Sequence, residues 1–276
     1  MSSAYKVEKF LDIECALGEG INISPDGSAI WWVDILGGLI HSKSKRRIFV
    51  STIPGVREPS SVLECKNDSA VVAARDGIYQ ISQKSRSATL IHSLPDLGMR
   101  SNDATKSPDG SYWVSRMDRK EEKQIGTIER ISVGSKGSEV LIKQLGIPNT
   151  LIIDQVRNQF IFGDSKKGVL FLQDLSPTFD LVGSPKVFFQ NKHAPGVPDG
   201  SALDKQGNIW NCRWGGSCIA KISPDGQLID LINLPTLYPT SCKFLSDKIL
   251  IVTTALGSSP KDYHPYAGHL LKVTIK

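Results

Sequence analysis

Short apolar segments recur along the whole chain at a nearly constant interval. Each is a run of five or six residues rich in β-branched and aromatic side chains, and it commonly follows a turn. The six copies are Ala29–Asp34, Ala70–Arg75, Tyr112–Met117, Gln159–Asp164, Asn208–Cys212 and Lys248–Thr253. Their starts are 40 to 49 residues apart. That interval is typical of a β-propeller, in which each blade is a four-stranded antiparallel sheet.

Tight turns support the repeat. The tetrapeptide Ser-Pro-Asp-Gly occurs at Ser24–Gly27, Ser107–Gly110 and Ser223–Gly226. Proline presets the backbone at the second position of a turn, and glycine accepts the strained last position. The first two copies directly precede an apolar segment, and the third lies between later strands of its blade. No stretch sustains an apolar period of about 3.6 residues, so we expect little helix.

The strands can be assigned within each blade. The four expected in blade five are Ser201–Leu203, Asn208–Cys212, Cys218–Ile222 and Gln227–Leu231. The last blade has only three, namely Ser241–Leu245, Lys248–Thr253 and Gly268–Ile275. A spare strand-like segment, Tyr5–Ile13, precedes the first blade, and pairing it with the last blade closes the ring without an open sheet edge. The sequence therefore predicts an all-β, six-bladed propeller formed by a single domain over residues 1–276.

Polar residues open the innermost strand of every blade. These residues are Glu19, Ser60, Asn102, Asn149, Asp199 and Thr240. Because innermost strands line the central channel of a propeller, we expect these side chains to gather around its axis. One interpretation is a channel that merely holds water.

A metal site is the other interpretation. Glu19, Asn149 and Asp199 offer carboxylate and amide oxygens from three blades, and such hard donors suit Ca²⁺, Mg²⁺ or Mn²⁺. Two converging carboxylates without a cation would repel each other and have raised pKa values. A divalent ion would neutralise both and leave positions open for water and substrate.

Composition excludes several classes of protein. No apolar run reaches the roughly 20 residues of a membrane span, and the N-terminus has no apolar core typical of a secretory signal. The five cysteines show no C-x-x-C spacing, so we expect reduced thiols and a cytoplasmic location. The net charge is +5. The one dense basic cluster, Lys43 to Arg47, has no interleaved aromatic residues, so we expect a solvated turn rather than a nucleic-acid surface.

Other catalytic motifs are absent. The sequence contains no G-x-S-x-G, no H-E-x-x-H and no P-loop. The five histidines are scattered, and only His193, shortly before Asp199, is expected near the mouth of the channel. A loop histidine of this kind is more often exposed than catalytic.

Four stretches resemble the gluconolactonase, regucalcin and luciferin-regenerating enzyme group of six-bladed propellers. The stretches are Leu17–Gly20 with Trp32–Asp34, Arg100–Asp103, Pro148–Asn149 with Phe162–Ser165, and Pro198–Gly200 with Asp204, Gly207–Asn208 and Trp210. The resemblance implies that Glu19, Asn149 and Asp199 bind a metal. It also implies that Arg100 and Asn102 contact the substrate, and that Asp199 takes part in the chemistry.

Some positions depart from the family pattern or leave a choice. Thr150 and Ala104 replace glycines, and Ile21 replaces a proline. The family also places an acidic substrate contact in the loop here formed by Asp118–Lys123, and the sequence leaves open whether Glu121, Glu122 or neither reaches the site. For Arg100, a structural role as counter-ion of Asp103 is an alternative to substrate binding.

The leading hypothesis is a metal-dependent carboxylic ester hydrolase that opens a small sugar lactone to its aldonic acid. Asp199 acts as general base, and one divalent ion, Ca²⁺ first and Zn²⁺, Mn²⁺, Mg²⁺ or Fe²⁺ otherwise, stabilises the developing oxyanion. The alternatives are a calcium-binding regulatory protein without turnover, a scaffold propeller that binds peptides, and a hydrolase of another ester or a phosphotriester. No nucleic acid or membrane is expected as a partner.

Overall fold

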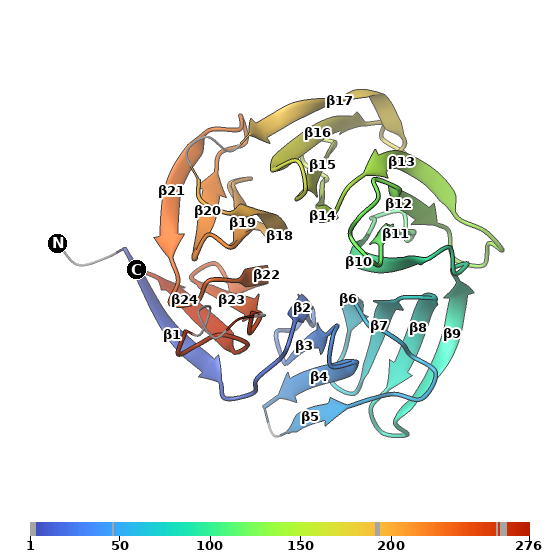
Figure 1. Cartoon of the computed structure of the whole chain (residues 1–276), viewed down its shortest axis with the longest axis horizontal. Coiled ribbons are helices and arrows are strands. Elements are labelled where there is room, and N and C mark those ends of the chain that lie inside the picture. The colour runs from blue at the N-terminus through green and yellow to red at the C-terminus, as the bar shows by residue number, and fades with distance from the viewer. Residues whose placement is uncertain (1–3, 46, 191–193, 258, 260–263) are drawn as a thin grey trace.

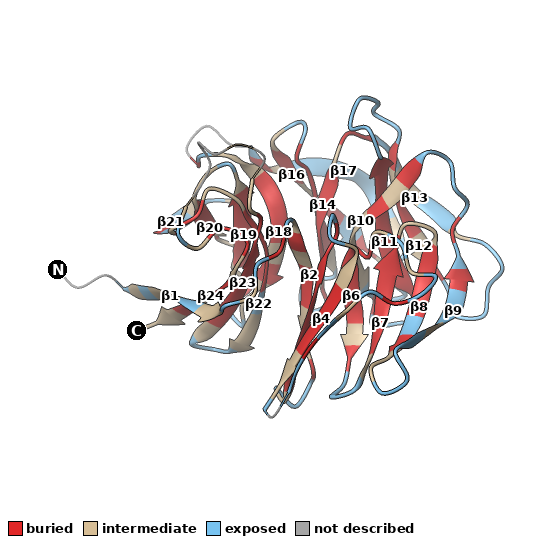
Figure 2. Cartoon of the chain, turned by 60° about the horizontal axis from the view of Figure 1, so that its bottom comes forward, coloured by how far each residue is buried: buried red, intermediate tan, exposed pale blue. Residues whose placement is uncertain are grey.

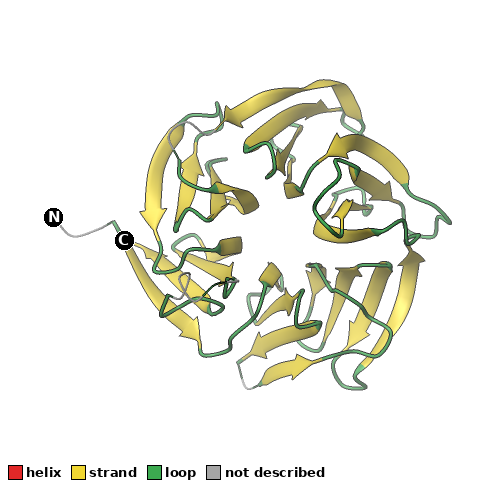
Figure 3. Cartoon of the chain, in the orientation of Figure 1, coloured by secondary structure: helices red, strands yellow, loops and turns green. Residues whose placement is uncertain are grey.

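A computed structural model describes residues 4–45, 47–190, 194–257, 259 and 264–276. Six four-stranded antiparallel sheets stand around a central axis like the blades of a propeller, as Figure 1 shows. The described residues contain strands and turns but no helix (Figure 3). The six-bladed, all-β fold predicted from the repeat is therefore confirmed.

Strands follow each other from the axis outward in sequence order within the first five blades. The innermost strands are β2 (Gly18–Ile23), β6 (Ser61–Cys65), β10 (Met99–Lys106), β14 (Pro148–Asp154), β18 (Val197–Leu203) and β22 (Pro239–Ser246). The second strands are β3 (Ala29–Asp34), β7 (Ser69–Ala74), β11 (Tyr112–Asp118), β15 (Gln159–Asp164), β19 (Ile209–Trp214) and β23 (Ile249–Thr254). These second strands are the six apolar segments of the sequence, within one or two residues at each end.

The outer half of each blade completes the sheet. The third strands are β4 (Leu39–Ser44), β8 (Gly77–Ser82), β12 (Gly126–Ile131), β16 (Val169–Leu175), β20 (Cys218–Ile222) and β24 (Leu270–Ile275). The outermost strands are β5 (Ile48–Ser51), β9 (Ser87–Ser93), β13 (Glu139–Leu145), β17 (Leu181–Gln190), β21 (Leu228–Asn233) and β1 (Tyr5–Leu11).

The N-terminal strand closes the ring as predicted. β1 pairs antiparallel with β24, from Tyr5 opposite Ile275 to Lys9 opposite Leu271. In Figure 1 the blue β1 lies beside the red β24 at the rim of the last blade. The first and last strands of the chain thus share one sheet, and β1 supplies the fourth, outermost strand that the last blade lacks.

Burial follows position in the blade. The second strands are almost entirely buried, and Trp31, Trp32, Trp113 and Trp210 on them are no more than 1% exposed. Figure 2 shows the inner strands mostly buried and the outermost strands largely exposed. Apolar side chains of adjacent sheets pack against one another, as in the cluster that joins the first two blades. Because each sheet has apolar residues on both faces, the core is a ring between blades.

The Ser-Pro-Asp-Gly segments form turns, as predicted. Their glycines Gly27, Gly110 and Gly226 have φ of +68°, +88° and +80°, a left-handed backbone that glycine adopts without strain. The third copy lies between β20 and β21.

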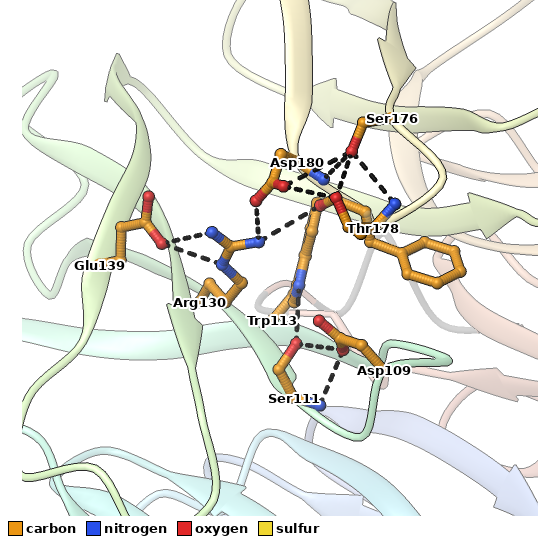
Figure 4. Close-up of polar contacts among 9 residues, drawn as sticks. Asp109, Ser111, Trp113, Arg130, Glu139, Ser176, Thr178 and Asp180 are labelled. Atoms are coloured by element: carbon orange, nitrogen blue, oxygen red, sulfur yellow. Dashed lines mark hydrogen bonds and ion pairs between the residues drawn. The ribbon is translucent and has the colours of Figure 1, made fainter.

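Polar contacts also tie blades together at their outer strands (Figure 4). Arg130 on β12 donates to Glu139 on β13 at 2.7 and 2.9 Å, and to Asp180 before β17 at 2.8 Å. The guanidinium therefore links the third blade to the fourth.

The basic cluster lies at the surface, because Lys45 and Arg47 are exposed between β4 and β5, as expected for a solvated turn. All five cysteines are buried and free. In the described part of the chain, no helix is long and apolar enough to cross a membrane.

Candidate functional site

Irregular register marks the inner strands near the polar residues predicted to surround the axis. The pairing of β2 with β3 shifts directly after Glu19, and that of β14 with β15 directly after Asn149. In β18 the shift falls between Pro198 and Ser201, around Asp199. Such bulges re-aim side chains and are frequent beside functional sites. They place equivalent residues of three blades at the same end of the channel.

The first of these bulges requires a glycine. Gly20 follows Glu19 and has a φ of +54°. A Cβ atom at this position would collide with the backbone of Ser60 and Ser61 in the next blade. The backbone beside the predicted ligand therefore approaches its neighbour as closely as glycine permits.

Buried aspartates fix the loops that enter two of these strands. Asp34, at the end of β3, accepts hydrogen bonds from the amides of Ala16 and Leu17 at 2.8 and 3.0 Å. Asp164, at the end of β15, accepts hydrogen bonds from the amides of Gly146 and Ile147, which precede β14, at 3.1 and 3.2 Å. The start of each inner strand is thereby held against its own blade.

One cavity of about 180 Å³ contains all five residues predicted for the site. Its lining is Leu17, Glu19, Arg100, Asn102, Glu121, Ile147, Asn149, Ser165, Lys166, Val197, Asp199 and Trp214. Side chains from the first, third, fourth and fifth blades thus meet at one end of the channel. The roles assigned to them remain predictions.

The other two polar residues of the inner ring have structural contacts. Ser60 is fully buried and donates to Ser101 of the third blade at 2.8 Å. Thr240 is also fully buried and donates to the Gly18 carbonyl oxygen of the first blade at 2.5 Å. Neither lines the cavity. Both hydroxyls join adjacent blades at the axis.

Burial perturbs the carboxyl groups around the axis. Burial first, and the charge of Asp103 second, raise the pKa of Glu19 to about 8. The pKa of Asp199 lies well above its ordinary value because of burial and the charges of Glu19 and Asp103. Burial also raises the pKa of Asp103. The site therefore concentrates acidic groups that pay an energetic penalty for ionising without a nearby cation.

The Asn149 amide has a fixed orientation. Ser165 Oγ donates to the Pro198 carbonyl oxygen at 2.6 Å, so it acts as acceptor for Asn149 Nδ2 at 2.9 Å. Asn149 Oδ1 consequently faces the cavity, where Asn102 Nδ2 donates to it at 3.0 Å. A carbonyl oxygen has a second lone pair, which is available to a cation.

Arg100 and Asn102 form a rigid pair beside this oxygen. Arg100 Nη1 donates to Asn102 Oδ1 at 2.7 Å and to the Ser101 carbonyl oxygen at 3.1 Å. Asp103 accepts from the amides of Ala104 and Leu151 at 2.8 and 3.2 Å. Arg100 thus makes its hydrogen bonds to Asn102 and the backbone, which favours its role in the cavity over the alternative of a counter-ion for Asp103.

Glu121, not Glu122, reaches the cavity. Glu121 lies 3.8 Å from Arg100 Nη2 and lines the cavity. Its loop is held from two sides. Asp118 accepts from the amides of Glu122 and Lys123 at 3.1 and 2.9 Å, and Lys166 Nζ donates to the Glu121 and Glu122 carbonyl oxygens at 2.7 and 3.2 Å.

The three residues that depart from the family pattern differ in their local structure. Thr150 has a φ of +55°, a conformation that strains a β-branched residue. Its hydroxyl donates to the Asp199 carbonyl oxygen and lies 3.0 Å from Ser201 Oγ. These contacts hold the fourth blade to the fifth. Ala104 continues β10 opposite Val114, and Ile21 is buried in the apolar contact between the first and last blades.

Sequence reasoning did not single out Lys166, Trp214 or Lys243. Lys166 lies two residues after β15, Trp214 is the last residue of β19, and both line the cavity. The available signal was their position where the second strand of a blade ends. Lys243 lies with Asp103 along a separate cavity of about 140 Å³ deeper in the channel. Burial lowers the pKa of Lys243, and its positive charge offsets only part of the effect of burial, which raises the pKa of Asp103. His193 lies outside the described residues.

The donor set fits a hard divalent cation. Among the described residues no three His, Cys, Asp or Glu side chains form a metal-binding group. The candidate set has two carboxylates and one amide oxygen, so water or substrate oxygens would complete its coordination. Burial first, and repulsion by neighbouring carboxylates second, raise the pKa values of Glu19 and Asp199, and a cation between the two groups would oppose the repulsion.

Known proteins share this architecture. The pentonolactonase XacC of Haloferax volcanii is 27% identical over 91% of the chain and 86% of its own length. A 6-deoxy-6-sulfogluconolactonase of Pseudomonas putida is 27% identical over 83% of the chain and 79% of its own length. The crystal structure of regucalcin from Agrobacterium tumefaciens, a calcium-binding protein, superposes with a TM-score of 0.89 at 27% identity, covering 98% of the chain and 94% of that structure. The family model of the SMP-30/Gluconolactonase/LRE-like region matches residues 17–256, and the chain belongs to this family.

Proposed function

We propose that the protein hydrolyses a sugar lactone to its aldonic acid with the help of one divalent metal ion. The observation that carries this proposal is the meeting of Glu19, Asn149 and Asp199 with Arg100 and Asn102 in one cavity. Two relatives of similar length are named lactonases, which supports a lactone as substrate. We propose Ca²⁺ first, in line with the calcium-binding regucalcin neighbour, and Zn²⁺, Mn²⁺, Mg²⁺ or Fe²⁺ as alternatives.

Glu19, Asn149 and Asp199 would hold the ion. When bound, it supplies Lewis-acid polarisation of the lactone carbonyl group. Asp199 accepts a proton from the attacking water while the water oxygen bonds to the carbonyl carbon. Gly200 N donates to Asp199 Oδ1 at 3.1 Å, so we assign the proton to Oδ2. The ring C–O bond then breaks, and the ring oxygen takes the proton from Asp199 to become a hydroxyl group. The new carboxyl group releases its proton to water.

Arg100, Asn102 and Glu121 orient the ring. The fixed guanidinium and amide groups can donate to sugar hydroxyls, and Glu121 can accept from them. Arg100 can also hydrogen-bond the carboxylate of the product. These contacts distinguish a polyhydroxylated lactone from a simple ester.

A pH-stat assay with aldonolactones tests the proposal. We expect acid release from glucono-δ-lactone that disappears after exhaustive chelation and returns with Ca²⁺ or Mn²⁺. Turnover that is unaffected by complete metal removal contradicts the metal-dependent mechanism. Tight Ca²⁺ binding without hydrolysis of any lactone or ester would instead favour a calcium-binding regulatory protein.

Removal of the Ser165 hydroxyl should weaken metal binding although Ser165 is not a proposed ligand. In Ser165→Ala the Asn149 amide loses the acceptor that orients it. Supporting contacts of this kind typically contribute about 10- to 100-fold to metal affinity. Calorimetric titration with Mn²⁺ measures the effect, and Ser87→Ala on the outermost strand β9 is the control. Equal affinity in Ser165→Ala and the control would show that Ser165 does not position the ligand.

Loss of the Lys166 ammonium group should loosen the Glu121 loop. In Lys166→Met both hydrogen bonds to the loop carbonyls disappear. A hydrogen bond to a charged group is worth enough for a roughly tenfold effect, so we expect KM for the lactone to rise about tenfold with a smaller change in kcat. Lys120→Met, an exposed lysine of the same loop, serves as the matched control. An unchanged KM would mean that Lys166 does not hold Glu121 for substrate binding.

A further inference from the structure

A second and larger cavity adjoins the candidate site. Its volume is about 610 Å³, within the range of about 300–1,000 Å³ for small-molecule sites. It is lined by Ala16, Leu17, Ile35, Leu36, Glu58, Arg100, Arg119, Glu121, Trp214, Tyr238, Ala255, Leu256 and Gly257. We call this cavity the vestibule. Apart from Arg100 and Glu121, its lining residues have no role in the proposed hydrolysis.

The vestibule and the catalytic cavity share a wall. Leu17, Arg100, Glu121 and Trp214 line both. A ligand whose reactive group lies among Glu19, Asn149 and Asp199 would therefore have the vestibule directly beside it. The smaller cavity, about 180 Å³, suits the lactone ring alone.

Apolar side chains dominate the vestibule. Trp214 and Tyr238 form an aromatic pair with centroids 4.4 Å apart and planes inclined by 37°. Ile35, Leu36 and Leu256 add aliphatic surface. Leu36 is 74% exposed, so most of its apolar surface is available to a ligand. This arrangement leaves a concave apolar surface in contact with water beside the candidate active site.

Two of the four charged residues of the vestibule are engaged with each other, because Arg119 Nη2 and Nε donate to Glu58 at 2.6 and 3.2 Å. The other two, Arg100 and Glu121, also line the catalytic cavity, where we assign them to the lactone ring. A second sugar ring would need several free hydrogen-bonding partners here, whereas an alkyl or aryl group needs only apolar contact. The wall chemistry therefore favours an apolar occupant.

We propose that the vestibule binds an apolar substituent of the substrate, so that the enzyme prefers lactones carrying an alkyl or aryl group beside the reactive ring. The inference rests on the proposed lactone hydrolysis and specifies its substrate class. Leu36 and Tyr238 are then specificity-determining residues that contact the substituent and not the reacting atoms.

A series of δ-lactones with a methyl to n-pentyl group on the carbon next to the ring oxygen tests this inference. Each buried methylene contributes about fourfold to binding when fully desolvated, so partial burial predicts a rise in kcat/KM of roughly tenfold or more from methyl to pentyl. In Leu36→Asn with Tyr238→Ser, the pentyl-to-methyl ratio should fall to within about threefold of unity. Val156 is another exposed aliphatic residue and lies after the end of β14, whereas Asn149 of the candidate site lies near its start. Val156→Asn should leave the ratio as in wild type.

Glucono-δ-lactone, assayed in parallel, separates the two claims. If it is hydrolysed while kcat/KM stays flat along the alkyl series, or the pentyl lactone is not turned over, the vestibule proposal is overturned and the proposed function stands. If the alkyl series shows the rise and glucono-δ-lactone is inert, the vestibule proposal holds and the sugar substrate is wrong. The wild-type series decides the question even where the double variant fails to fold.

Discussion

Replacement of Asp199 by asparagine is expected to lower kcat for lactone hydrolysis by about 10²- to 10⁴-fold, the usual contribution of a general base. The change keeps the size of the side chain and an oxygen that can accept from the Gly200 amide. It removes the group that takes the proton from water, together with one of two negative charges proposed to hold the metal. Asp199→Asn therefore tests the chemistry with little disturbance of the fold.

Two measurements isolate the proton-transfer role. Initial rates at a metal concentration that saturates the variant exclude weaker metal binding as the cause of the loss. Asp174→Asn, an exposed aspartate on β16, controls for the change in net charge and should retain wild-type kcat. Near-normal turnover of metal-saturated Asp199→Asn would assign the base to another group.

The repeat made the fold predictable because propeller blades are local in sequence. Five of the six sheets form from consecutive strands, so apolar segments and turns define them without long-range information. The boundaries of inner strands were less visible. β18 begins at Val197, four residues before the predicted start, because Val197 and Pro198 pair with Trp214 and Arg213 across a bulge. Proline and glycine around Asp199 conceal that strand in the sequence.

The candidate site was predictable only as far as it follows the repeat. Glu19, Asn149 and Asp199 occupy equivalent places in three blades, so their convergence could be expected. Contacts between blades have no such signal. The hydrogen bond from Asn149 to Ser165 lies within one blade, but Ser165 is oriented by Pro198 of the next. The vestibule likewise combines Trp214 and Tyr238 with Leu36, which lies far away in sequence.

Polar residues at equivalent positions of the inner strands differ in role because their neighbours differ. Ser60 and Thr240 open inner strands just as Asn102 does, yet their hydroxyls are consumed by adjacent blades. Asn102 instead hydrogen-bonds to Arg100 and Asn149, which line the cavity with it. This distinction cannot be predicted from the sequence because it depends on the packing of one sheet against the next.

The second large effect concerns thermal stability and its dependence on pH. A metal ion at about a thousandfold excess over its Kd should stabilise the protein by about 4 kcal/mol, which corresponds to a rise in Tm of roughly 10 °C for a chain of this size. In the metal-free protein the pKa of Glu19 is raised to about 8 from its ordinary value of 4.5. Glu19 stays protonated in the folded protein at pH values at which it ionises in the unfolded chain. The free energy of unfolding of the metal-free protein therefore falls as the pH rises from about 4.5 to about 8. Bound metal requires the ionised form, so the gap in Tm should widen from pH 5 to pH 8.

Glu19→Gln separates this electrostatic account from general effects of pH. The neutral amide has no charge to desolvate, so the metal-free variant should melt higher than metal-free wild type at pH 8 and equally at pH 5. Because one charged ligand is missing, the variant should also lose most of the stabilisation by metal. Scanning calorimetry of both proteins, with and without Ca²⁺ or Mn²⁺, measures all four states. If wild type has the same Tm with and without metal at every pH, no cation binds at the site. If the difference in Tm between the two states remains in Glu19→Gln, the cation binds elsewhere. Glu19 thus lowers the stability of the metal-free protein as the pH approaches 8 and raises that of the metal-bound protein. Folding of the axial channel is therefore coupled to binding of the ion that we propose.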